Sequence, residues 1–568
     1  MKNRWVLTTK YRLDDIVERE KARLVVKGFT QVCGADYDET YSPVSSYATL
    51  RIFLSIVAVL DLNLMQLDMK NAFLQSKFDR VLYMDQPNYF DDGTGRVCKL
   101  LKSLYGLKQS PLLWYRALDG VLQGAGWKKC QVDEALYFKA SDNGVTCWVL
   151  AYVDDLLAAS SSPAMLKELK ELLEDAFELR EISPVVKRFI DEEQGSRVPK
   201  TPVTVDAYAE LTFDDEEAQE QEEEEYRQKV GSLQFAATTM RPDIGFACSK
   251  LGSGLTVRRD QHWREVDRCL AYLADTRDTA LEFSSGPESL ELIGYVDADD
   301  AGDKQKRMST SVYAFVYKGA AVSWSSSCIK CATLSSTGSE YVAATNVGKE
   351  GRRLRFLLAE FKLLDAGKPT ILRVDNKSAI TVAAGLGLTG NLKHMERRYA
   401  WLQHMVRRGK FVLMYIPTTE QPADFVTKAL HFPALSQCSV AIGQVRLVGG
   451  GVCWKHSGGG AIDMPPTHQM CCFRMCSLQV SRRCSEVLAP PSLGQRRRLG
   501  RMYGSSSRPS TVGELLDRLR RAAGDRYGVA VDQGARQLQL TGLGDGWAVD
   551  QEGQFDREVD GGVRRPEK

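Results

Sequence analysis

The sequence lacks an apolar segment near its start that could act as a secretion signal or cross a membrane. Residues 1–5 include Lys2 and Arg4 and form no apolar core. The longest apolar run nearby, residues 52–60, contains Ser55 and falls well short of the roughly 20 residues that span a bilayer. We therefore expect a protein that is neither secreted nor inserted in a membrane.

The sequence also lacks internal repeats, sustained heptads and a large excess of charge. These absences exclude a repeat solenoid and a long coiled coil, and the net charge of +2 indicates no class of partner. The length of 568 residues suggests about three to four domains. Hydrophobic and charged fractions of 43% and 26% are typical of globular proteins, so sizeable cores can form.

Cysteine is present but points to no disulfide framework. Fourteen cysteines without a secretion signal favour reduced thiols in a cytosolic or nuclear protein. Cys453-x2-His456 and His468-x2-Cys471 have the spacing of zinc ligands, but the glycines and prolines around them favour no ordered zinc site. Since this texture begins near residue 433, we expect residues 433–568 to be an unrelated, disordered tail.

The rest of the chain divides into four segments. Residues 1–180 and 291–432 alternate strand-like and helical patterns, which predicts multidomain α/β and α+β architecture. Residues 241–290 have helical patterning. The remaining segment, residues 181–240, follows the first α/β segment. It includes an acidic run, residues 214–225, which we expect to be a solvated, disordered linker.

Two adjacent carboxylates, Asp154 and Asp155, form the most informative pair of residues. Apolar runs on both sides predict a strand, a turn that carries the acids, and a second strand. Buried adjacent carboxylates need a compensating cation, which indicates a divalent-metal site; a surface turn is the alternative. Asp68 ends another strand-like run and could join the pair if the strands are neighbours. Three such carboxylates suit phosphoryl transfer with two Mg²⁺ ions.

A second group of acids lies where strands end or helices begin in the later α/β segment. Its members are Asp297, Glu340, Asp375 and Asp424. Each acid taken alone is equally consistent with a helix cap or a surface position. If the strand ends and helix starts meet at one edge of a mixed sheet, the four could hold two metals for phosphodiester hydrolysis by an activated water.

Several longer motifs in the first segment occur in a characteristic order. Residues 21–25, 36–44, 66–74, 103–111 and 152–157 together resemble the reverse transcriptase of copia-type LTR retrotransposons. The resemblance implies a right-hand polymerase, with fingers and palm in residues 1–180. Asp68, Asp154 and Asp155 match its palm carboxylates, with Asp68 and Asp154 as the direct metal ligands.

The same resemblance implies substrate-binding roles for four residues. Lys21 and Arg23 match finger residues that hold the triphosphate, which suits the fork-like recognition of phosphate by arginine; a solvated basic strand is the alternative. Phe73 matches the side chain that packs under the incoming sugar and excludes a 2′-hydroxyl. Tyr105 would line the nucleotide pocket.

The later α/β segment resembles the RNase H domain of the same elements. The matching stretches are residues 239–244, 262–263, 321–326, 393–399 and 424–430. The resemblance places Asp297, Glu340, Asp375 and Asp424 at the four catalytic and metal-binding positions of an RNase H-like mixed-sheet domain, residues 291–432. Residues 181–240 would then be a truncated thumb-like region and residues 241–290 a helical connection.

The resemblance implies an RNA-directed DNA polymerase with RNase H activity and two Mg²⁺ or Mn²⁺ ions at each site. The expected partners are an RNA template, a DNA primer, the RNA–DNA hybrid and deoxynucleoside triphosphates, with no membrane. The expected location is the cytoplasm, within a virus-like particle, or the nucleus. Because the chain starts inside the fingers, it resembles a fragment of a polyprotein.

One departure from the family bears on activity. The family has a hairpin that grips the primer end after the helix that ends here near Leu179, whereas residues 180–189 run almost directly into residues 200–202. Misplacing a primer end by about an ångström can cost on the order of a hundredfold in rate. The alternatives are therefore a degenerate copy with RNase H but no polymerase activity, and a non-catalytic nucleic-acid-binding remnant. Gly338, Asp300 and Ala400 also depart from the family.

Overall fold

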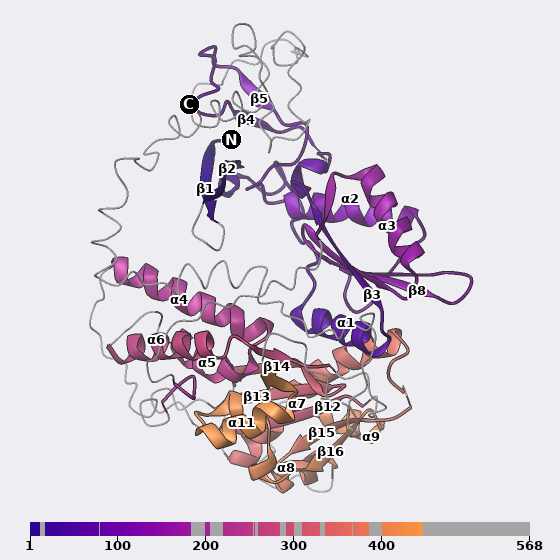
Figure 1. Cartoon of the computed structure of the whole chain (residues 1–568), viewed down its shortest axis with the longest axis vertical. Helices are drawn as coiled ribbons and strands as arrows, with labels where there is room; N and C mark the ends of the chain where they lie inside the picture. The colour runs from indigo at the N-terminus through magenta and orange to yellow at the C-terminus, as the bar shows by residue number, and fades with distance from the viewer. Residues whose placement is uncertain are drawn as a thin grey trace, which may run out of the picture.

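The described part of the chain consists of two parts stacked one on the other (Figure 1). The structure is a computed structural model, and it describes residues 1–11, 17–78, 80–182, 199–204, 220–253, 255, 260–283, 291–299, 309–329, 335–365, 367–385 and 400–446. We refer to residues 1–182 as the N-terminal part and to residues 199–446 as the C-terminal part. Helix α1 (Tyr47–Val59) belongs to the first and lies where the two meet.

The N-terminal part is built on a six-stranded antiparallel sheet in the order β10-β3-β9-β8-β7-β6. Its strands are β3 (Asn63–Met69), β6 (Lys128–Lys129), β7 (Leu136–Ala140), β8 (Thr146–Tyr152), β9 (Asp155–Ser160) and β10 (Leu179–Ile182). Helices α2 (Ser110–Gly124) and α3 (Pro163–Ala176) cover one face and share an apolar core with it. The opposite face packs against α1.

A long hairpin and several short elements complete the N-terminal part. The hairpin joins β1 (Asn3–Tyr11) to β2 (Val17–Val26), and β4 (Tyr83–Asp85) pairs with β5 (Val97–Lys99). The end of β2 meets the loop at Tyr105, where the Val26 amide donates to the Tyr105 carbonyl at 2.9 Å. The next residue, Gly106, has φ +92°, and a Cβ there would lie 2.1 Å from the Val26 carbonyl oxygen. Glycine at that position therefore permits the close approach of the two segments.

The C-terminal part is built on a mixed five-stranded sheet in the order β14-β13-β12-β15-β16. Its strands are β12 (Ile293–Asp299), β13 (Thr310–Tyr317), β14 (Ala320–Cys328), β15 (Thr370–Val374) and β16 (Phe411–Tyr415). The first three pair antiparallel, whereas β12, β15 and β16 run parallel. The mixed sheet predicted for this segment is therefore present.

Helices surround this sheet. They are α7 (Ser336–Glu360), α8 (Lys377–Ala383), α9 (Ala400–Arg407), the short α10 (Asp424–Thr427) and α11 (Phe432–Ala441), with a 3-10 turn, η7 (Thr418–Glu420). Polar caps define the starts of two of them. The Ser335 hydroxyl accepts from the Gly338 amide, and the Asn376 side chain accepts from the Ala379 amide. Each cap satisfies a backbone donor that has no partner within its own helix.

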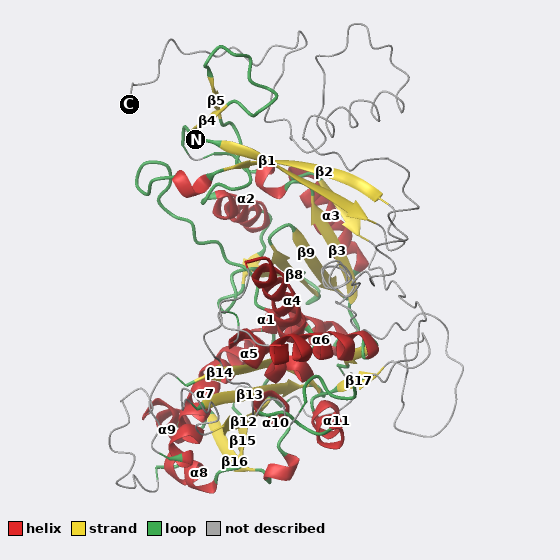
Figure 2. Cartoon of the chain, turned by 90° about the vertical axis from the view of Figure 1, so that its left-hand side faces the viewer, coloured by secondary structure: helices red, strands yellow, loops and turns green. Residues whose placement is uncertain are grey.

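Three helices of the C-terminal part lie between the two sheets, as Figure 2 shows. They are α4 (Glu220–Thr239), α5 (Gly245–Ser253) and α6 (Asp260–Asp275), with a 3-10 turn, η4 (Pro242–Ile244), at the corner between α4 and α5. At this corner the Arg241 guanidinium binds both carboxylate oxygens of Asp243, at 2.9 and 2.7 Å. Both residues are buried. Strand β11 (Thr279–Leu281) follows and pairs with β17 (Gln444–Arg446).

Two of the expected boundaries are wrong. The acidic run expected to be a disordered linker enters α4, which begins at Glu220 and includes residues 220–225. Glutamate has a high helix propensity, and negative charge is favourable at a helix N-terminus. The start expected for the tail, residue 433, is also wrong, because residues 432–446 form α11 and β17, and the Gln444 side-chain amide donates to buried Asp243 at 2.7 Å.

Helix α1 is buried around its whole circumference. Every residue from Ala48 to Val57 is buried, and its apolar side chains belong to one continuous core that also includes residues of β7, β8, α4, β14 and α7. A helix that is apolar on all sides needs cover on all sides. The sheet of the N-terminal part covers one side of α1 and the C-terminal part covers another, so the two parts share one core.

Several other expectations from the sequence concern a membrane-spanning helix, residues outside the described part of the chain, or departures from the family. No helix among the described residues is long and apolar enough to cross a membrane. The zinc-like spacings at residues 453–471, Asp300, and most of the segment where the primer-gripping hairpin is missing lie outside the described residues. The departure at Ala400 lies at the start of α9, and Gly338 lies in the first turn of α7.

Candidate active sites

The first candidate site is the tight turn between β8 and β9. Val153 occupies the turn with φ +58°, a conformation that is strained for a β-branched residue. Two hydrogen bonds hold it: the Trp114 indole donates to the Val153 carbonyl at 2.6 Å, and the Met69 amide donates to the Asp154 carbonyl at 2.8 Å. The strand–turn–strand predicted from the sequence is present, with Asp154 in the turn and Asp155 opening β9.

Asp68 lies beside this turn, as the sequence predicted for neighbouring strands. In the antiparallel pairing of β3 with β9, Asp68 is directly opposite Asp155. We call Asp68, Asp154 and Asp155 the first centre. Their electrostatic effects on one another follow from this proximity.

Negative charge accumulates at the first centre. Burial, together with the neighbouring carboxylates of Asp154 and Asp68, raises the pKa of Asp155 to about 6. The pKa of Asp154 is also raised, first by burial and then by Asp68, although Lys21 and Arg23 oppose the shift. Such a group is stabilised by added positive charge.

Arg180 supplies part of that charge. This residue of β10 donates from Nε to the Oδ2 of Asp68 at 2.8 Å. The Arg180 side chain is 54% exposed, so the ion pair is worth at most about 1 kcal/mol. Nothing in the local sequence pattern indicated this contact, because it joins residues that are far apart along the chain.

The four predicted nucleotide-binding residues lie near the first centre. The Phe73 and Tyr105 rings meet edge to face, with centroids 5.0 Å apart. The Arg23 guanidinium lies over the Tyr105 ring, 5.5 Å from its centroid. Arg23 and Lys21 lie on β2, close enough to lower the pKa of Asp154. This arrangement favours a basic surface facing the acids over a strand exposed only to solvent.

The second candidate site lies at the edge of the five-stranded sheet. Asp297 is on β12, Asp375 directly follows the parallel neighbour β15, and Glu340 is in the first turns of α7. One carboxylate oxygen from each of these three lies within 4.8 Å of the others. Asp424 opens α10 and lies close enough to Asp297 that the Asp297 carboxylate raises the pKa of Asp424. All four predicted acids therefore meet, and we call them the second centre.

The second centre is buried as well as acidic. Burial, together with the nearby carboxylates of Asp297, Asp375 and Asp424, raises the pKa of Glu340 to about 9. The pKa of Asp424 is raised to about 6, again mainly by burial. Two oxygens, Glu340 Oε2 and Asp424 Oδ1, are buried with no hydrogen-bond partner among the described residues. Because unpaired buried oxygens of this kind are costly, the donor set fits a hard divalent cation.

Three polar side chains support the second centre without being predicted to do so. Lys428 pairs with the Asp424 Oδ2 at 2.7 Å, and the Thr418 hydroxyl donates to the Asp375 Oδ2 at 3.0 Å. The Gln421 side-chain amide donates to the Val296 backbone carbonyl at 2.8 Å. This hydrogen bond attaches the η7–α10 segment to β12. Only the contact between Asp424 and Lys428 has a local signal, since i,i+4 partners share one face of a helix.

Sequence comparison relates the chain to mobile genetic elements. The family model described as "Reverse transcriptase (RNA-dependent DNA polymerase)" matches residues 1–210. The Pol polyprotein of transposon TNT 1-94 from Nicotiana tabacum is 34% identical over 474 residues, covering 78% of this chain and 35% of the relative. The putative transposon Ty5-1 protein of Saccharomyces cerevisiae is 30% identical over 309 residues, covering 50% of this chain and all of the relative (100%).

The chain spans about a third of the length of the plant Pol polyproteins that it matches, which include that of transposon RE2 from Arabidopsis thaliana at 32% identity. Among solved structures, a foamy viral protease–reverse transcriptase in complex with an RNA/DNA hybrid is 12% identical, with a TM-score of 0.37. That alignment covers 73% of this chain and 51% of the viral chain.

Proposed function

The chain belongs to the Pol polyproteins of copia-type LTR retrotransposons, and we propose that it is an RNA-directed DNA polymerase that also hydrolyses the RNA strand of an RNA–DNA hybrid. In this proposal residues 1–180 are fingers and palm, residues 181–240 a reduced thumb-like region, and residues 291–432 an RNase H-like domain. The substrates are an RNA template, a DNA primer, the hybrid and deoxynucleoside triphosphates.

One observation carries the proposal: seven carboxylates that are far apart in the sequence gather into two centres. Three of them meet at the β8–β9 turn, and four meet at the edge of the second sheet. Both groups contain acids whose pKa values burial has raised. Clusters of buried carboxylates are costly without cations, and the relatives are Pol polyproteins. Metal-dependent phosphoryl transfer accounts for both facts.

At the first centre, Asp68 and Asp154 would be the direct ligands, with Asp155 beside them. Two Mg²⁺ or Mn²⁺ ions, when bound, supply charge that stabilises the attacking and leaving oxygens of an in-line displacement. Lys21 and Arg23 would bind the triphosphate, and the Phe73 ring, held by Tyr105, would pack under a sugar that lacks a 2′-hydroxyl. The strained turn keeps Asp154 in place for the primer 3′-oxygen.

At the second centre, Asp297, Glu340 and Asp375 would share the ions, and Asp424 would complete the set. The attacking water would be held on the side of the cluster that receives the RNA phosphodiester. Thr418 keeps the Asp375 carboxylate oriented, and Lys428 does the same for Asp424. Because hydrolysis must proceed at any sequence, contacts to the backbone and to the shape of the hybrid should dominate binding.

A second candidate function is RNase H activity without polymerase activity. Arg180 favours it, because its guanidinium binds an oxygen of Asp68 that a metal would need. The shortened segment after β10 points the same way, since the family places its primer-gripping hairpin there. In that case the second centre alone would remain active.

A paired assay on the purified chain tests both functions. Primer extension on an RNA template and cleavage of an RNA–DNA hybrid are measured in Mg²⁺ for the native sequence, Asp154→Asn and Asp375→Asn. The dual function predicts that Asp154→Asn loses extension and keeps cleavage, whereas Asp375→Asn loses cleavage and keeps extension. Cleavage without extension in the native sequence would leave only the second candidate.

Exposed acids provide the matched controls for this assay. Asp142→Asn, in the turn before β8, and Glu291→Gln, just before β12, remove the same charge outside the two centres. Both variants should retain both activities. Nucleic-acid binding with neither activity in the native chain would refute both functions and leave a binding remnant.

A further inference from the structure

The contact surface between the two parts contains a polar clamp that neither centre uses. At its middle is Arg51 of α1, which is 5% exposed. Its Nε donates to the Val322 carbonyl of β14 at 2.8 Å. Its Nη1 donates to the carbonyls of Thr238 and Thr239, the last two residues of α4, also at 2.8 Å. One side chain thus joins three elements from distant parts of the sequence.

Trp324 of β14 completes this arrangement. Its ring lies under the Arg51 guanidinium, 3.8 Å from the ring centroid, and its indole donates to the Ala237 carbonyl at 2.8 Å. Three consecutive carbonyls at the end of α4 are therefore bound by Arg51 and Trp324. We call Arg51, Trp324 and the carbonyls that they bind the Arg51 clamp.

The clamp buries a cation among neutral partners. Burial lowers the pKa of Arg51 to about 9, while the nearby Glu350 carboxylate and tyrosine side chains oppose the shift. The negative end of the α4 dipole and the Trp324 ring offset part of the cost. A buried charge is a poor means of gaining stability but a good means of fixing one arrangement of its partners. The role of Arg51 that follows from this is to fix the position of α1 relative to α4 and β14.

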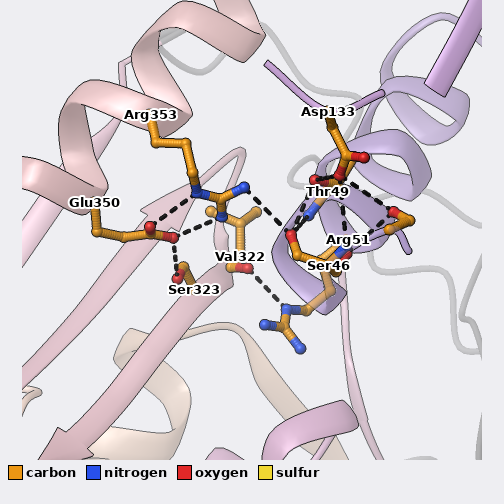
Figure 3. A network of polar contacts seen from close by, with 9 residues as sticks. Ser46, Thr49, Arg51, Asp133, Val322, Ser323, Glu350 and Arg353 are labelled. Carbon is orange, nitrogen blue, oxygen red and sulfur yellow. Dashed lines mark hydrogen bonds and ion pairs between the residues drawn. The ribbon is translucent and has the colours of Figure 1, made fainter. Parts of the chain in front are cut away.

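A second set of contacts runs parallel to the clamp (Figure 3). Asp133, from the N-terminal part, accepts from the Thr49 hydroxyl of α1 at 2.6 Å. At the start of α1, the Ser46 hydroxyl accepts from Arg353 of α7 at 3.3 Å, and Arg353 binds Glu350 through two nitrogens. Glu350 in turn accepts from Ser323 of β14 at 2.8 Å. Helix α7 is thereby fixed to α1.

These contacts connect the first centre to the second through two helices, α1 and α7. Tyr152, two residues before Asp154, stacks on Tyr47 in the first turn of α1, with ring centroids 6.4 Å apart. At the other end, α7 carries both Glu350 and Glu340, which are ten residues apart and so about 15 Å along the helix axis. The position of Glu340 relative to the β8–β9 turn is therefore set across α1.

We propose that Arg51 is a positioning residue that sets the distance along the hybrid between the primer end at the first centre and the RNA bond cut at the second. The inference rests on the proposed function, and it concerns where the RNA is cut rather than whether it is cut. A hybrid bound across both centres is cut at one distance only if the two parts cannot move relative to each other. The clamp removes that freedom.

The test maps cut positions on a labelled RNA annealed to a DNA primer whose 3′ end is recessed. With the full chain in Mg²⁺, the native sequence should cut within a narrow window at a fixed distance from the primer end. Lengthening the primer by a few nucleotides should move the window by the same number. In Arg51→Met the window should broaden and cease to follow the primer end. Hydrolysis of a blunt hybrid, which has no recessed end, should be retained.

Further variants separate positioning from folding. Trp324→Phe keeps an aromatic ring beside Arg51 but removes the hydrogen bond to Ala237, so it should broaden the window less than Arg51→Met. Arg51→Lys should restore part of the register, because an ammonium keeps the charge but not the planar fork of donors. Arg116→Met, on the exposed face of α2, is the matched control and should cut as the native chain does. If Arg51→Met does not fold, Arg51→Lys and Trp324→Phe provide the test.

Sharp native cut positions in Arg51→Met and Trp324→Phe would overturn the inference. So would native cuts that ignore the primer end, although the proposed hydrolysis would then still stand. Absence of cleavage of either substrate by the native chain would overturn the hydrolysis itself and, with it, the positioning role.

Discussion

Glu340 has a pKa raised to about 9, first because burial removes it from water and then because Asp297, Asp375 and Asp424 lie nearby. The folded state therefore holds a proton that the unfolded state releases at much lower pH. Between the two pKa values the unfolded chain binds fewer protons, so stability falls as pH rises. The acids with pKa values of about 6, Asp155 and Asp424, act in the same direction but only at lower pH.

We therefore predict that the metal-free protein loses stability between pH 6 and pH 8 and that Glu340→Gln removes most of this loss. One titrating group contributes up to about 1.4 kcal/mol per pH unit. The measurement is the thermal unfolding midpoint in chelator across this range. Glu291→Gln, an exposed control, should keep the native slope. Saturating Mg²⁺ should also flatten it, because a bound cation offsets the buried charge; equal slopes in all samples would contradict this account.

At the scale of single elements, the β8–β9 turn depends on Trp114. The indole holds the carbonyl of a residue in a strained conformation, and the same side chain packs edge to face on Phe177. Strain at such a turn persists only where its surroundings impose it. Removing the hydrogen bond should let Asp154 shift without opening the core.

Trp114→Phe is accordingly predicted to reduce primer extension while leaving cleavage of the hybrid unchanged. A displacement of about an ångström at a reacting centre can cost on the order of a hundredfold in rate. Trp127→Phe is the matched control, since Trp127 is buried in the same core and should tolerate the change. Equal extension rates for the two variants would show that the turn does not need this bond.

The corner between α4 and α5 depends on a buried ion pair. Asp243 accepts hydrogen bonds from Arg241, Tyr272 and Gln444, so three separate stretches of the chain meet at this carboxylate. Burial alone would raise the pKa of Asp243, but Arg241 and the other donors lower it overall. The carboxylate is therefore charged and fully engaged.

Asp243→Asn should destabilise the protein by about 3–5 kcal/mol, because it removes the carboxylate that binds the buried Arg241 guanidinium through both of its oxygens. Asp267→Asn on α6 is the control; its carboxylate is 62% exposed, and the change should stay within about 0.5 kcal/mol. Denaturant unfolding of both variants measures the difference. A small effect for Asp243→Asn would mean that solvent reaches the corner.

Local sequence patterns predicted the elements that hold the acids but not the contacts between distant elements. The strand ends at Asp68 and Asp297 follow from apolar runs, and a strand needs only its own pattern to be recognised. The start of α4 was missed because an acidic run is consistent with both a linker and a helix N-terminus. Arg51 carried no signal at all, since its partner Val322 is 271 residues away.

At the scale of the whole molecule, the two parts share a core. The apolar side chains of α1 belong to one hydrophobic cluster that also contains residues of both sheets. The members from α1 are Ala48, Leu50, Ile52, Phe53, Leu54, Ile56 and Val57. Exposing a buried side chain of this size costs about 1.5–3 kcal/mol. Uncovering even a few of them would consume most of the roughly 5–15 kcal/mol by which a typical domain is stable.

A fragment of residues 1–182 is therefore predicted not to fold alone, although it contains all residues of the first centre. It should aggregate or bind a hydrophobic dye, and it should lack a cooperative thermal transition. The full chain, which covers α1, should show one. Sedimentation and dye binding distinguish the two outcomes, and a monomeric fragment with a sharp transition would disprove the shared core.

The burial of α1 also limits where related retrotransposons can recombine within this coding sequence. A recombination event that joined the first sheet of one relative to the second sheet of another would pair an α1 with a foreign β14 and α7. The Arg51 guanidinium would then contact β14 and α4 carbonyls and a residue at position 324 that had not coevolved with it. Viable crossovers should therefore be rare between α1 and the end of α7, so that the two proposed activities would be inherited as one unit.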